Sequence, residues 1–600
     1  MARATRRINP QRAMSHSHHK LVTLLRGRLR ATRWLRPSED HTLLLWAAIC
    51  GVLGALATLA FRESIHGLQW WLTGNTSGSL VEMAEGLPWY LRVAFPTVGG
   101  LIAGGFLVWA RHVPSGASSD YMEAVTLGEG RLPVRQSLLR SISSLFTIAS
   151  GGSIGREGSM VQLAALASSL VGRAIHFEPA RLRILVACGA AAGLTSAYNA
   201  PIAGAFFVTE IVIGSIAMGS FGPILVASVV ANIAMRELPG YKPAYEMPAF
   251  PPIYGIEVLC FLALGLLCGA LSPPFLRLLN VSKRGFQRLS IPLPLRLALG
   301  GLGVGLLSIW VPQVWGNGYS VVNALLHDQW AWSTVLTILV FKVIATALTT
   351  GSGAVGGVFT PTLFVGAAIG YLVGALVHTL WPGATSGPFA YVMVGMGAFL
   401  AASTSAPLMA ILMIFEMTLS YQAVLPLMLA CVVAYFVARS RGEASMYEVT
   451  IKRHRDAGAR LRLRGIRMRE LIRPAETVLT LDATFDDISK VFLEYPVRYV
   501  YIVDAVGTYL GVVALQDIAS AMHKGNDMTG RTARNVLREE FLQVITPDMS
   551  LTDALQRFMQ HQGERLPAVD GDTRQLLGVV HKSTLLDACV QLSELDCCRN

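Results

Sequence analysis

Apolar runs separated by short glycine- and proline-rich breaks fill the chain from residue 42 to residue 440. A helix that crosses a bilayer at right angles needs about 20 apolar residues, and many of these runs are shorter. Short or interrupted helices leave irregular backbone at membrane depth, which is tolerated only where it is buried in protein or lines a polar cavity. The pattern therefore predicts the core of a helical transporter or channel. The runs lie at about 43–61, 93–110, 138–153, 160–175, 182–197, 200–219, 221–235, 254–272, 296–311, 333–349, 362–380, 388–402, 407–419 and 422–438.

Polar segments flank this apolar region, which would form a transmembrane pore domain at 42–440. Residues 1–41 are expected to form a basic tail, 441–470 a linker, and 471–590 a soluble part with ordinary surface charge. Lys and Arg beside membrane spans stay on the cytoplasmic side, so both termini are predicted to be cytoplasmic. About forty polar and basic residues precede the first apolar run, which does not fit a secretory signal.

The composition excludes several classes of protein. The chain is 52% hydrophobic and only 15% charged, whereas soluble domains carry about 25% charged residues. A soluble enzyme, a disordered chain and a disulfide scaffold are therefore poor interpretations. The net charge of +12 would also suit a nucleic-acid-binding protein. The basic clusters flank the apolar region, however, so a lipid bilayer is the expected partner and nucleic acid is not.

An internal repeat relates two halves of the apolar region, at about 42–235 and 254–440. Asn-Ala-Pro at 199–201 precedes Glu210, and Ser-Ala-Pro at 405–407 precedes Glu416, with the same spacing and an offset of 206. Transporters built from such repeats hold their substrate site at the repeat interface. The repeat therefore predicts a central site between the halves, and the two glutamates are expected to make structural hydrogen bonds.

The soluble part contains a second repeat of about 60 residues. Leu-Gly-Val-Val occurs at 510–513 and again at 577–580. In each copy short β-like runs alternate with amphipathic helices. This pattern predicts two βαββα-like units, at 471–525 and 535–590.

Two glycine-rich segments interrupt apolar sequence, one in each half. Residues 151–159 and 356–361 both precede a predicted helix. The start of a helix leaves N–H groups unpaired and carries the positive end of the helix dipole, so two helix starts that face one site would bind an anion. Partial charges hold an ion less tightly than a Lys or Arg does, which allows the ion to leave.

Glu157 lies in the first of these segments. A carboxylate inside a membrane is costly and is functional by default. At a helix start it can occupy the anion site itself, and protonation or displacement by an anion would release it. We therefore predict that Glu157 is a gate; the alternative is a dipole partner with no gating role. Its neighbour Arg156 is expected to tie down the turn or to contact the ion.

The motifs Gly-Arg-Glu-Gly at 155–158 and Gly-Val-Phe-Thr-Pro at 357–361 resemble those of the CLC family of chloride channels and chloride/proton antiporters, in particular bacterial voltage-gated chloride channel-like members. The C-terminal repeat resembles the CBS domain pair that many members carry. The resemblance covers about residues 42–590. It implies an all-α polytopic membrane domain of two inverted repeats with broken helices, followed by a cytoplasmic α/β CBS-domain pair. It also implies a homodimer with one pore per subunit and chloride as the ligand. No cofactor is expected to be required, and no metal site is expected.

The resemblance also implies roles for individual residues. Glu157 falls on the gating glutamate of the family. The N–H groups of Val358 and Phe359 fall on the central anion site, those around Glu157 and Gly158 on the outer site, and the Tyr447 hydroxyl on the central ion. The complete set of expected anion-binding residues is Ser118, Arg156, Glu157, Gly158, Val358, Phe359, Thr360 and Tyr447.

Three positions depart from the family pattern. Ser118 falls on the serine of a Gly-Ser-Gly-Ile-Pro motif whose glycines and proline are absent here. The resemblance therefore does not assign the geometry of the inner anion contact. Ser159 replaces the usual proline after Gly158, which leaves selectivity open. Ile211 occupies the position at which proton-coupled members carry a glutamate, and an aliphatic side chain cannot relay a proton.

The CBS pair suggests adenine-nucleotide sensing, but few local residues fit. The ribose contacts of the family come from a Thr or Ser and an Asp after the Gly-Val-Val strand. The first repeat has Ala514 and Asp517 at these positions, and the second has His581 and Thr584. Asp517 alone matches, so a structural or dimer-stabilising role is preferred over nucleotide binding.

The preferred function is a passive chloride channel gated by Glu157, and the alternative is a chloride/proton antiporter with weak coupling. An intramembrane metalloprotease needs a motif such as HExxH, which the sequence lacks, so the protein is not expected to be an enzyme. A cation transporter would use intramembrane carboxylates such as Glu210 and Glu416, but helix starts at the breaks favour anions. The expected location is the bacterial inner membrane.

Overall fold

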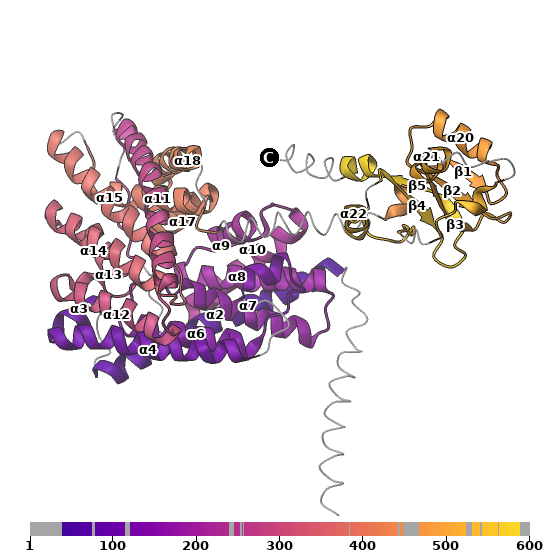
Figure 1. Ribbon diagram of the computed structural model, residues 1–600. Helices are drawn as coiled ribbons and strands as arrows, with labels where there is room; N and C mark the ends of the chain where they lie inside the picture. The colour runs from indigo at the N-terminus through magenta and orange to yellow at the C-terminus, as the bar shows by residue number, and fades with distance from the viewer. Residues whose placement is uncertain are drawn as a thin grey trace, which may run out of the picture. The chain divides into compact units, whose positions relative to one another are not determined.

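Each apolar run expected between residues 43 and 438 coincides with a helix in the computed structural model (Figure 1). By its internal contacts the chain divides into two units, Met1–Thr450 and Ile451–Asn600. The first unit contains the apolar helices and the second the small sheets. The structure describes residues 39–74, 79–113, 120–238, 245–251, 255, 257–382, 385–441, 445–447, 467–523, 531–539, 543–561 and 563–588.

The helices of the first unit follow the same order in both halves. The first half contains α2 (Glu39–Thr73), α3 (Leu80–Gly86), α4 (Trp89–His112), α5 (Tyr121–Thr126), α6 (Val134–Ala149), α7 (Glu157–Ala174), α8 (Pro179–Tyr198), α9 (Pro201–Phe206), the π-helix η2 (Phe207–Ile213) and α10 (Met218–Glu237). The second contains α11 (Glu257–Arg288), α12 (Leu293–Trp310), η3 (Pro312–Val314), α13 (Tyr319–His327), α14 (Trp332–Gly351), α15 (Phe359–Leu380), α16 (Pro388–Thr404), α17 (Pro407–Thr418), η4 (Tyr421–Ala423) and α18 (Val424–Ser440).

Equivalent helices pack in equivalent ways. In the first half α8 packs against α7, α2 and α10, and in the second half α16 packs against α15, α11 and α18. The equivalent helices α8 and α16 also end in the same left-handed backbone conformation. Asn199 ends α8 with φ 58° and ψ 35°, and Ser405 ends α16 with φ 58° and ψ 32°. The prediction of two repeats with broken helices is therefore confirmed.

Nine helices in the described part of the chain are long and apolar enough to cross a membrane. Others are shorter, among them Pro201–Ile213, Pro388–Thr404 and Pro407–Thr418. Short apolar helices of this kind need protein around them, because lipid cannot satisfy exposed backbone groups. The first unit is therefore an integral membrane domain, as the apolar pattern predicted.

The two halves meet closely where α4 lies beside α12 (Figure 1). Glycines allow this approach, as they do between many membrane helices. A Cβ atom added to Gly100 on α4 would lie 2.5 Å from the carbonyl oxygen of Leu297, and one added to Gly305 on α12 would lie 2.7 Å from the Cα of Val93. Larger residues at either position would push the halves apart.

The second unit is α/β. Its first repeat contains β1 (Val478–Thr480), α20 (Phe485–Glu494), β2 (Tyr499–Val503), β3 (Tyr509–Ala514) and α21 (Leu515–His523). Its second repeat contains η6 (Ala533–Asn535), α22 (Leu551–Met559), β4 (Arg565–Val569) and β5 (Leu576–His581), and η5 (Met468–Glu470) precedes both repeats. Strand β1 pairs parallel with β2, β2 pairs antiparallel with β3, and β4 pairs antiparallel with β5. The predicted CBS-like pair with small sheets is confirmed.

A shared apolar cluster joins the two repeats of this unit. Tyr501 and Tyr509 from the first sheet pack with Val569 and Val579 from the second. The backbone N–H of Tyr509 also donates to the carbonyl oxygen of Arg574 at 3.0 Å. The two repeats therefore form one packed body within the unit.

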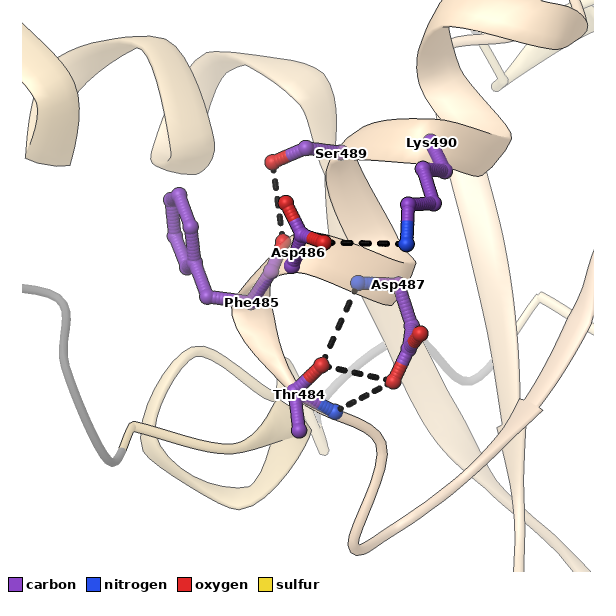
Figure 2. Close-up of polar contacts among 6 residues, drawn as sticks. All are labelled: Thr484, Phe485, Asp486, Asp487, Ser489 and Lys490. Atoms are coloured by element: carbon purple, nitrogen blue, oxygen red, sulfur yellow. Dashed lines mark hydrogen bonds and ion pairs between the residues drawn. The ribbon is translucent and has the colours of Figure 1, made fainter.

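Helix α20 begins at a capping box, which Figure 2 shows. The Thr484 hydroxyl accepts from the Asp487 backbone N–H at 3.3 Å, and the Asp487 carboxylate accepts from the Thr484 N–H at 3.1 Å. This reciprocal arrangement satisfies N–H groups that the helix cannot satisfy itself. The donors of Thr484 stabilise the ionised carboxylate and so lower the pKa of Asp487.

Candidate functional site

The two glycine-rich breaks, far apart in sequence, lie against each other. The backbone N–H of Gly155 donates to the carbonyl oxygen of Gly357 at 2.7 Å, and the N–H of Gly357 donates to the carbonyl oxygen of Gly155 at 2.8 Å. This two-bond antiparallel bridge joins the first half of the membrane domain to the second. The helices that follow the two breaks therefore begin side by side.

Helix α7 begins at Glu157 after the N-cap Arg156, and α15 begins at Phe359 after the N-cap Val358. Neither N-cap residue makes a side-chain capping bond. The N–H groups in the first turn of a helix have no acceptor within the helix, and the dipole adds positive potential at the same place. Two such ends at one bridge create a site for negative charge.

The Glu157 carboxylate lies at this junction and is only 3% exposed. Its Oε1 atom accepts from the hydroxyl of Tyr319 at 3.1 Å and from the hydroxyl of Thr360. Its Oε2 atom has no hydrogen-bond donor among the described residues. Oε2 lies instead against the glycine bridge, since a Cβ atom added to Gly357 would be 2.9 Å from it.

Aromatic residues surround this carboxylate on the side of Tyr319. The Arg156 guanidinium lies over the Tyr319 ring, 5.1 Å from its centre. The Tyr245 ring meets Tyr319 edge to face at 4.8 Å, and the Tyr198 ring lies 6.4 Å from it. The hydroxyl of Tyr198 is 2.9 Å from the hydroxyl of Thr360. These rings therefore enclose the two hydroxyl groups that hold Glu157.

A cavity of about 440 Å³ opens beside the two helix starts. Predicted anion-binding residues from both halves of the chain line it together, namely Glu157, Gly158, Val358, Phe359 and Tyr447. Ser159, at the position that departs from the family pattern, also lines the cavity, as do Gly356 and Gly357 of the second glycine segment. Tyr447 packs edge to face with Phe207 at 6.2 Å.

Two predicted anion-binding residues do not line the cavity, and a third is not described. Arg156 does not line the cavity and stacks on Tyr319. Thr360 does not line the cavity either, because its hydroxyl donates to Glu157. Ser118 lies outside the described residues. Among the described residues, five of the eight predicted anion-binding residues thus line the cavity.

Charged residues also line the same cavity. Arg140, Lys283 and Asp120 contribute to its wall. Lys342, which lies within the apolar run 333–349, is 1% exposed and donates to the carbonyl oxygens of Val314 at 2.8 Å, Trp315 at 3.2 Å and Gly316 at 2.8 Å. It therefore holds the loop that leads to Tyr319.

Glu210 and Glu416 each bind the start of a helix in the opposite repeat. Glu416 accepts from the N–H groups of Ile202 at 2.8 Å and Ala203 at 2.7 Å. Glu210 accepts from Leu408 at 3.4 Å and Met409 at 2.9 Å. These bonds are the structural ones expected from the repeat. Next to Glu210, the side chain of Ile211 is buried in the π-helix η2.

Tyr198 and Tyr319 were not predicted as site residues, although both lie beside Glu157. Tyr198 ends α8 at the point where the repeat predicts a break, and its repeat mate is a threonine, Thr404. Tyr319 follows a Gly-Asn-Gly break at 316–318. Both positions therefore carried a local signal, namely a polar aromatic residue at the edge of a broken helix.

In the second unit Asp517 makes an ion pair. Two nitrogen atoms of Arg538 bind its two carboxylate oxygens, each at 2.7 Å. At the other predicted ribose positions, Ala514 is buried, and burial together with the nearby Arg565 guanidinium lowers the pKa of His581. The carboxylate that best matched a nucleotide site is thus already neutralised by an arginine of this chain.

Comparisons with known proteins agree with this architecture. Residues 99–439 match the voltage gated chloride channel family, and residues 468–524 and 533–591 match the CBS domain. A ClcB-like protein of Ralstonia nicotianae is 56% identical over 70% of this chain and 99% of the relative. The voltage-gated ClC-type chloride channel ClcB of Salmonella typhimurium is 41% identical over 68% of this chain and 99% of the relative.

A solved structure is similar as well. The crystal structure of a slow cyanobacterial Cl⁻/H⁺ antiporter is 26% identical, with a TM-score of 0.60. The similarity covers 68% of this chain and 97% of the antiporter.

Proposed function

Because this chain belongs to the CLC family of voltage-gated chloride channels, a family of membrane transporters of chloride, we propose that it is a passive chloride channel gated by Glu157. The observation that carries the proposal is the position of Glu157. Its carboxylate lies where two helix starts from opposite repeats meet, at the wall of the cavity. The positive potential that holds this carboxylate is the potential that would attract a chloride ion.

In the proposed mechanism the carboxylate and the anion compete for the same potential. When Glu157 is ionised, it takes the place of an anion and blocks the path. When it is protonated, or when an entering chloride displaces it, the N–H groups around Gly158 and Phe359 become free to bind the ion. Partial charges from backbone dipoles hold chloride weakly enough for it to leave again.

Two features support conduction without proton coupling. Ile211 has a buried aliphatic side chain at the position at which proton-coupled members resemble one another in carrying a glutamate. Its neighbour Glu210 is engaged with the N–H groups of Leu408 and Met409. Neither residue offers a free carboxylate that could carry a proton from the cytoplasmic side.

The second candidate function is a chloride/proton antiporter with weak or non-standard coupling. The similarity to the slow cyanobacterial Cl⁻/H⁺ antiporter favours it, since that protein is 26% identical over most of its length. The two functions share the anion site and the Glu157 gate. They differ in whether protons cross the membrane in fixed ratio with chloride.

The reversal potential under a pH gradient distinguishes these functions. The full chain would be reconstituted in planar bilayers with equal chloride on both sides and a difference of two pH units. A channel reverses at zero millivolts, the chloride equilibrium potential, because protons do not contribute. A shift of the reversal potential away from zero with the pH gradient would reject the channel and support the antiporter.

We extend the proposal to the assembly and its setting. The protein is a homodimer in a bacterial inner membrane, with one pore in each subunit and both termini in the cytoplasm. The basic segments on both sides of the membrane domain support this orientation. The CBS pair has a structural role and no cofactor is required, since the ion pair between Asp517 and Arg538 occupies the carboxylate that would bind a ribose.

A further inference from the structure

Three hydroxyl groups and the Glu157 carboxylate form a continuous hydrogen-bonded chain in the membrane domain. Tyr198 contacts Thr360 at 2.9 Å, Thr360 donates to Oε1 of Glu157, and Tyr319 donates to the same oxygen at 3.1 Å. The members come from α7, α8, α13 and α15, so both repeats contribute. Tyr198 is 2% exposed and Thr360 is fully buried, so water does not compete for these bonds.

The chemistry of the groups sets the direction of each bond. An ionised carboxylate only accepts hydrogen bonds, and a hydroxyl has one hydrogen to donate. Because Thr360 uses its hydrogen for Glu157, its oxygen is left to accept from the hydroxyl of Tyr198. Tyr198 therefore orients Thr360 without touching Glu157, and the whole chain points toward the carboxylate.

The two carboxylate oxygens of Glu157 therefore differ in the hydrogen-bond donors that they contact. Oε1 has two hydroxyl donors, whereas Oε2 lies against the bridge between Gly155 and Gly357 and has no donor among the described residues. Hydrogen bonds to the charged form of a group favour that form. Each donor on Oε1 therefore stabilises the ionised carboxylate, which is the closed gate of the proposed mechanism.

We propose that the hydroxyl chain Tyr198–Thr360, together with Tyr319, sets the pH at which the Glu157 gate opens, and that Tyr198 is a positioning residue in it. This inference rests on the proposed function, because it assigns a regulator to the same gate. Hydroxyl groups inside the membrane domain thus determine the pH at which the Glu157 gate responds. Hydroxyl side chains at these positions thus set the pH at which the gate opens, while chloride passes through the cavity.

Other charged and titratable groups surround the carboxylate and the cavity. Arg156 stacks on Tyr319 and has a buried Nε atom with no acceptor among the described residues. Tyr245 packs on Tyr319, but its own hydroxyl is buried without a partner in the described part of the chain. Tyr447 from the segment 445–447 lines the cavity. The remaining groups of this kind that line the cavity are Asp120, Tyr121, Arg140 and Lys283.

The test uses chloride efflux from liposomes that contain the full chain, measured from pH 4 to pH 8. Tyr198→Phe keeps the ring and removes the hydroxyl that orients Thr360. It is expected to move the midpoint of the pH response toward higher pH by less than the loss of a direct donor does, because Tyr198 acts on Glu157 only through Thr360. Thr360→Val and Tyr319→Phe each remove a direct donor and are expected to move the midpoint in the same direction by about one unit, the effect of one hydrogen bond to a charged group. Thr360→Ser, which keeps the hydroxyl, is expected to restore the midpoint of the native chain.

Tyr245→Phe is the matched control, because it removes a buried hydroxyl that makes no bond to the chain of donors. It is expected to leave the midpoint unchanged. An unshifted midpoint in Tyr198→Phe, or an equal shift in Tyr245→Phe, would overturn the inference.

Glu157→Gln separates this inference from the proposed function. If this variant keeps its pH response, the gate itself is rejected. If it loses the response while Tyr198→Phe leaves the midpoint in place, only the role of the hydroxyl chain is rejected. In the double variant Tyr198→Phe/Glu157→Gln, the flux is expected to equal that of Glu157→Gln at every pH.

Discussion

Gly155 and Gly357 exchange two backbone hydrogen bonds, at 2.7 and 2.8 Å, across an interval of about 200 residues. The bridge brings the starts of α7 and α15 to one place in the membrane domain. The Glu157 side chain, two residues after the first glycine, lies at this bridge. The proposed gate and the proposed anion site thus both depend on one contact between the two repeats.

The first prediction concerns the bridge itself. A Cβ atom at Gly155 would overlap Oε2 of Glu157, so Gly155→Ala is expected to displace the carboxylate from its hydroxyl donors. The clash would cost about 1–3 kcal/mol, and chloride efflux from liposomes at pH 7 is expected to rise. Gly105→Ala on α4, where a Cβ atom meets nothing within 4 Å, is the control. Native efflux in a folded Gly155→Ala variant would show that the carboxylate does not block the path.

The second prediction concerns the reciprocal glutamates. Glu416→Gln replaces one of the two carboxylate oxygens by an NH2 group that cannot accept, so one backbone N–H loses its acceptor and the variant is expected to lose about 2 kcal/mol of stability. Glu210→Gln is expected to behave in the same way and to leave the reversal potential unchanged under a pH gradient. Thermal unfolding in detergent measures the first effect, with the exposed Glu237→Gln as control. A changed reversal potential in Glu210→Gln would identify this residue as a proton carrier instead.

The third prediction concerns Tyr447. Its ring packs against Phe207 and the residue lines the cavity, so Tyr447→Phe is expected to keep the fold and to remove only the hydroxyl. Loss of one hydrogen bond to chloride is expected to weaken binding about tenfold. Calorimetric titration of chloride into the detergent-solubilised protein measures this, and Tyr421→Phe, on a residue that is 78% exposed, is the control. Equal affinities would mean that the Tyr447 hydroxyl does not contact the ion.

The fourth prediction concerns the CBS unit. Thr484→Ala removes the capping box of α20 (Figure 2) and is expected to cost about 1 kcal/mol of its stability. Because the pKa of Asp487 is lowered below its ordinary value of 3.8, the folded unit binds this proton less readily than the unfolded chain does. The contribution of Asp487 is therefore present above about pH 4 and is lost as the pH falls through the folded pKa.

Hydrogen exchange of the α20 amides in the full chain measures both effects, once the rates are normalised to the intrinsic rate at each pH. Asp487→Asn is expected to flatten the acid dependence, while Asp482→Asn, outside the capping box, is not. An identical acid dependence in Asp487→Asn and the native chain would rule out the assigned role of this carboxylate.

The sequence predicted most of the membrane fold, because a bilayer requires helices to satisfy their own backbone and this requirement leaves apolar runs and glycine breaks in the pattern. Glu157 could also be found, since a carboxylate between apolar runs is costly. The hydroxyl donors could not, because Tyr319 and Thr360 lie 162 and 203 residues from Glu157 along the chain. Only the packing of both repeats brings them to the carboxylate.

Other site details also depended on tertiary structure. The repeat predicted structural bonds for Glu210 and Glu416 but not that each would bind the helix start of the other repeat. Arg156 was expected to tie down the turn or to contact the ion, and Thr360 to bind the ion; in the structure the Arg156 guanidinium lies over the Tyr319 ring and the Thr360 hydroxyl donates to Glu157. A motif gives the identity of these residues, but the direction of their side chains follows from neighbours that are distant in sequence.

The gate is tested most directly by the pH dependence of chloride efflux in Glu157→Gln, compared with the native chain in the same liposomes. Glutamine keeps the shape of the side chain and cannot ionise, so the variant is expected to conduct at pH 7.5 as fast as at pH 4.5, while the native chain conducts faster in acid. The control is Glu178→Gln, a change to an exposed glutamate at the start of α8. If Glu157→Gln keeps the acid activation of the native chain, Glu157 is not the gate.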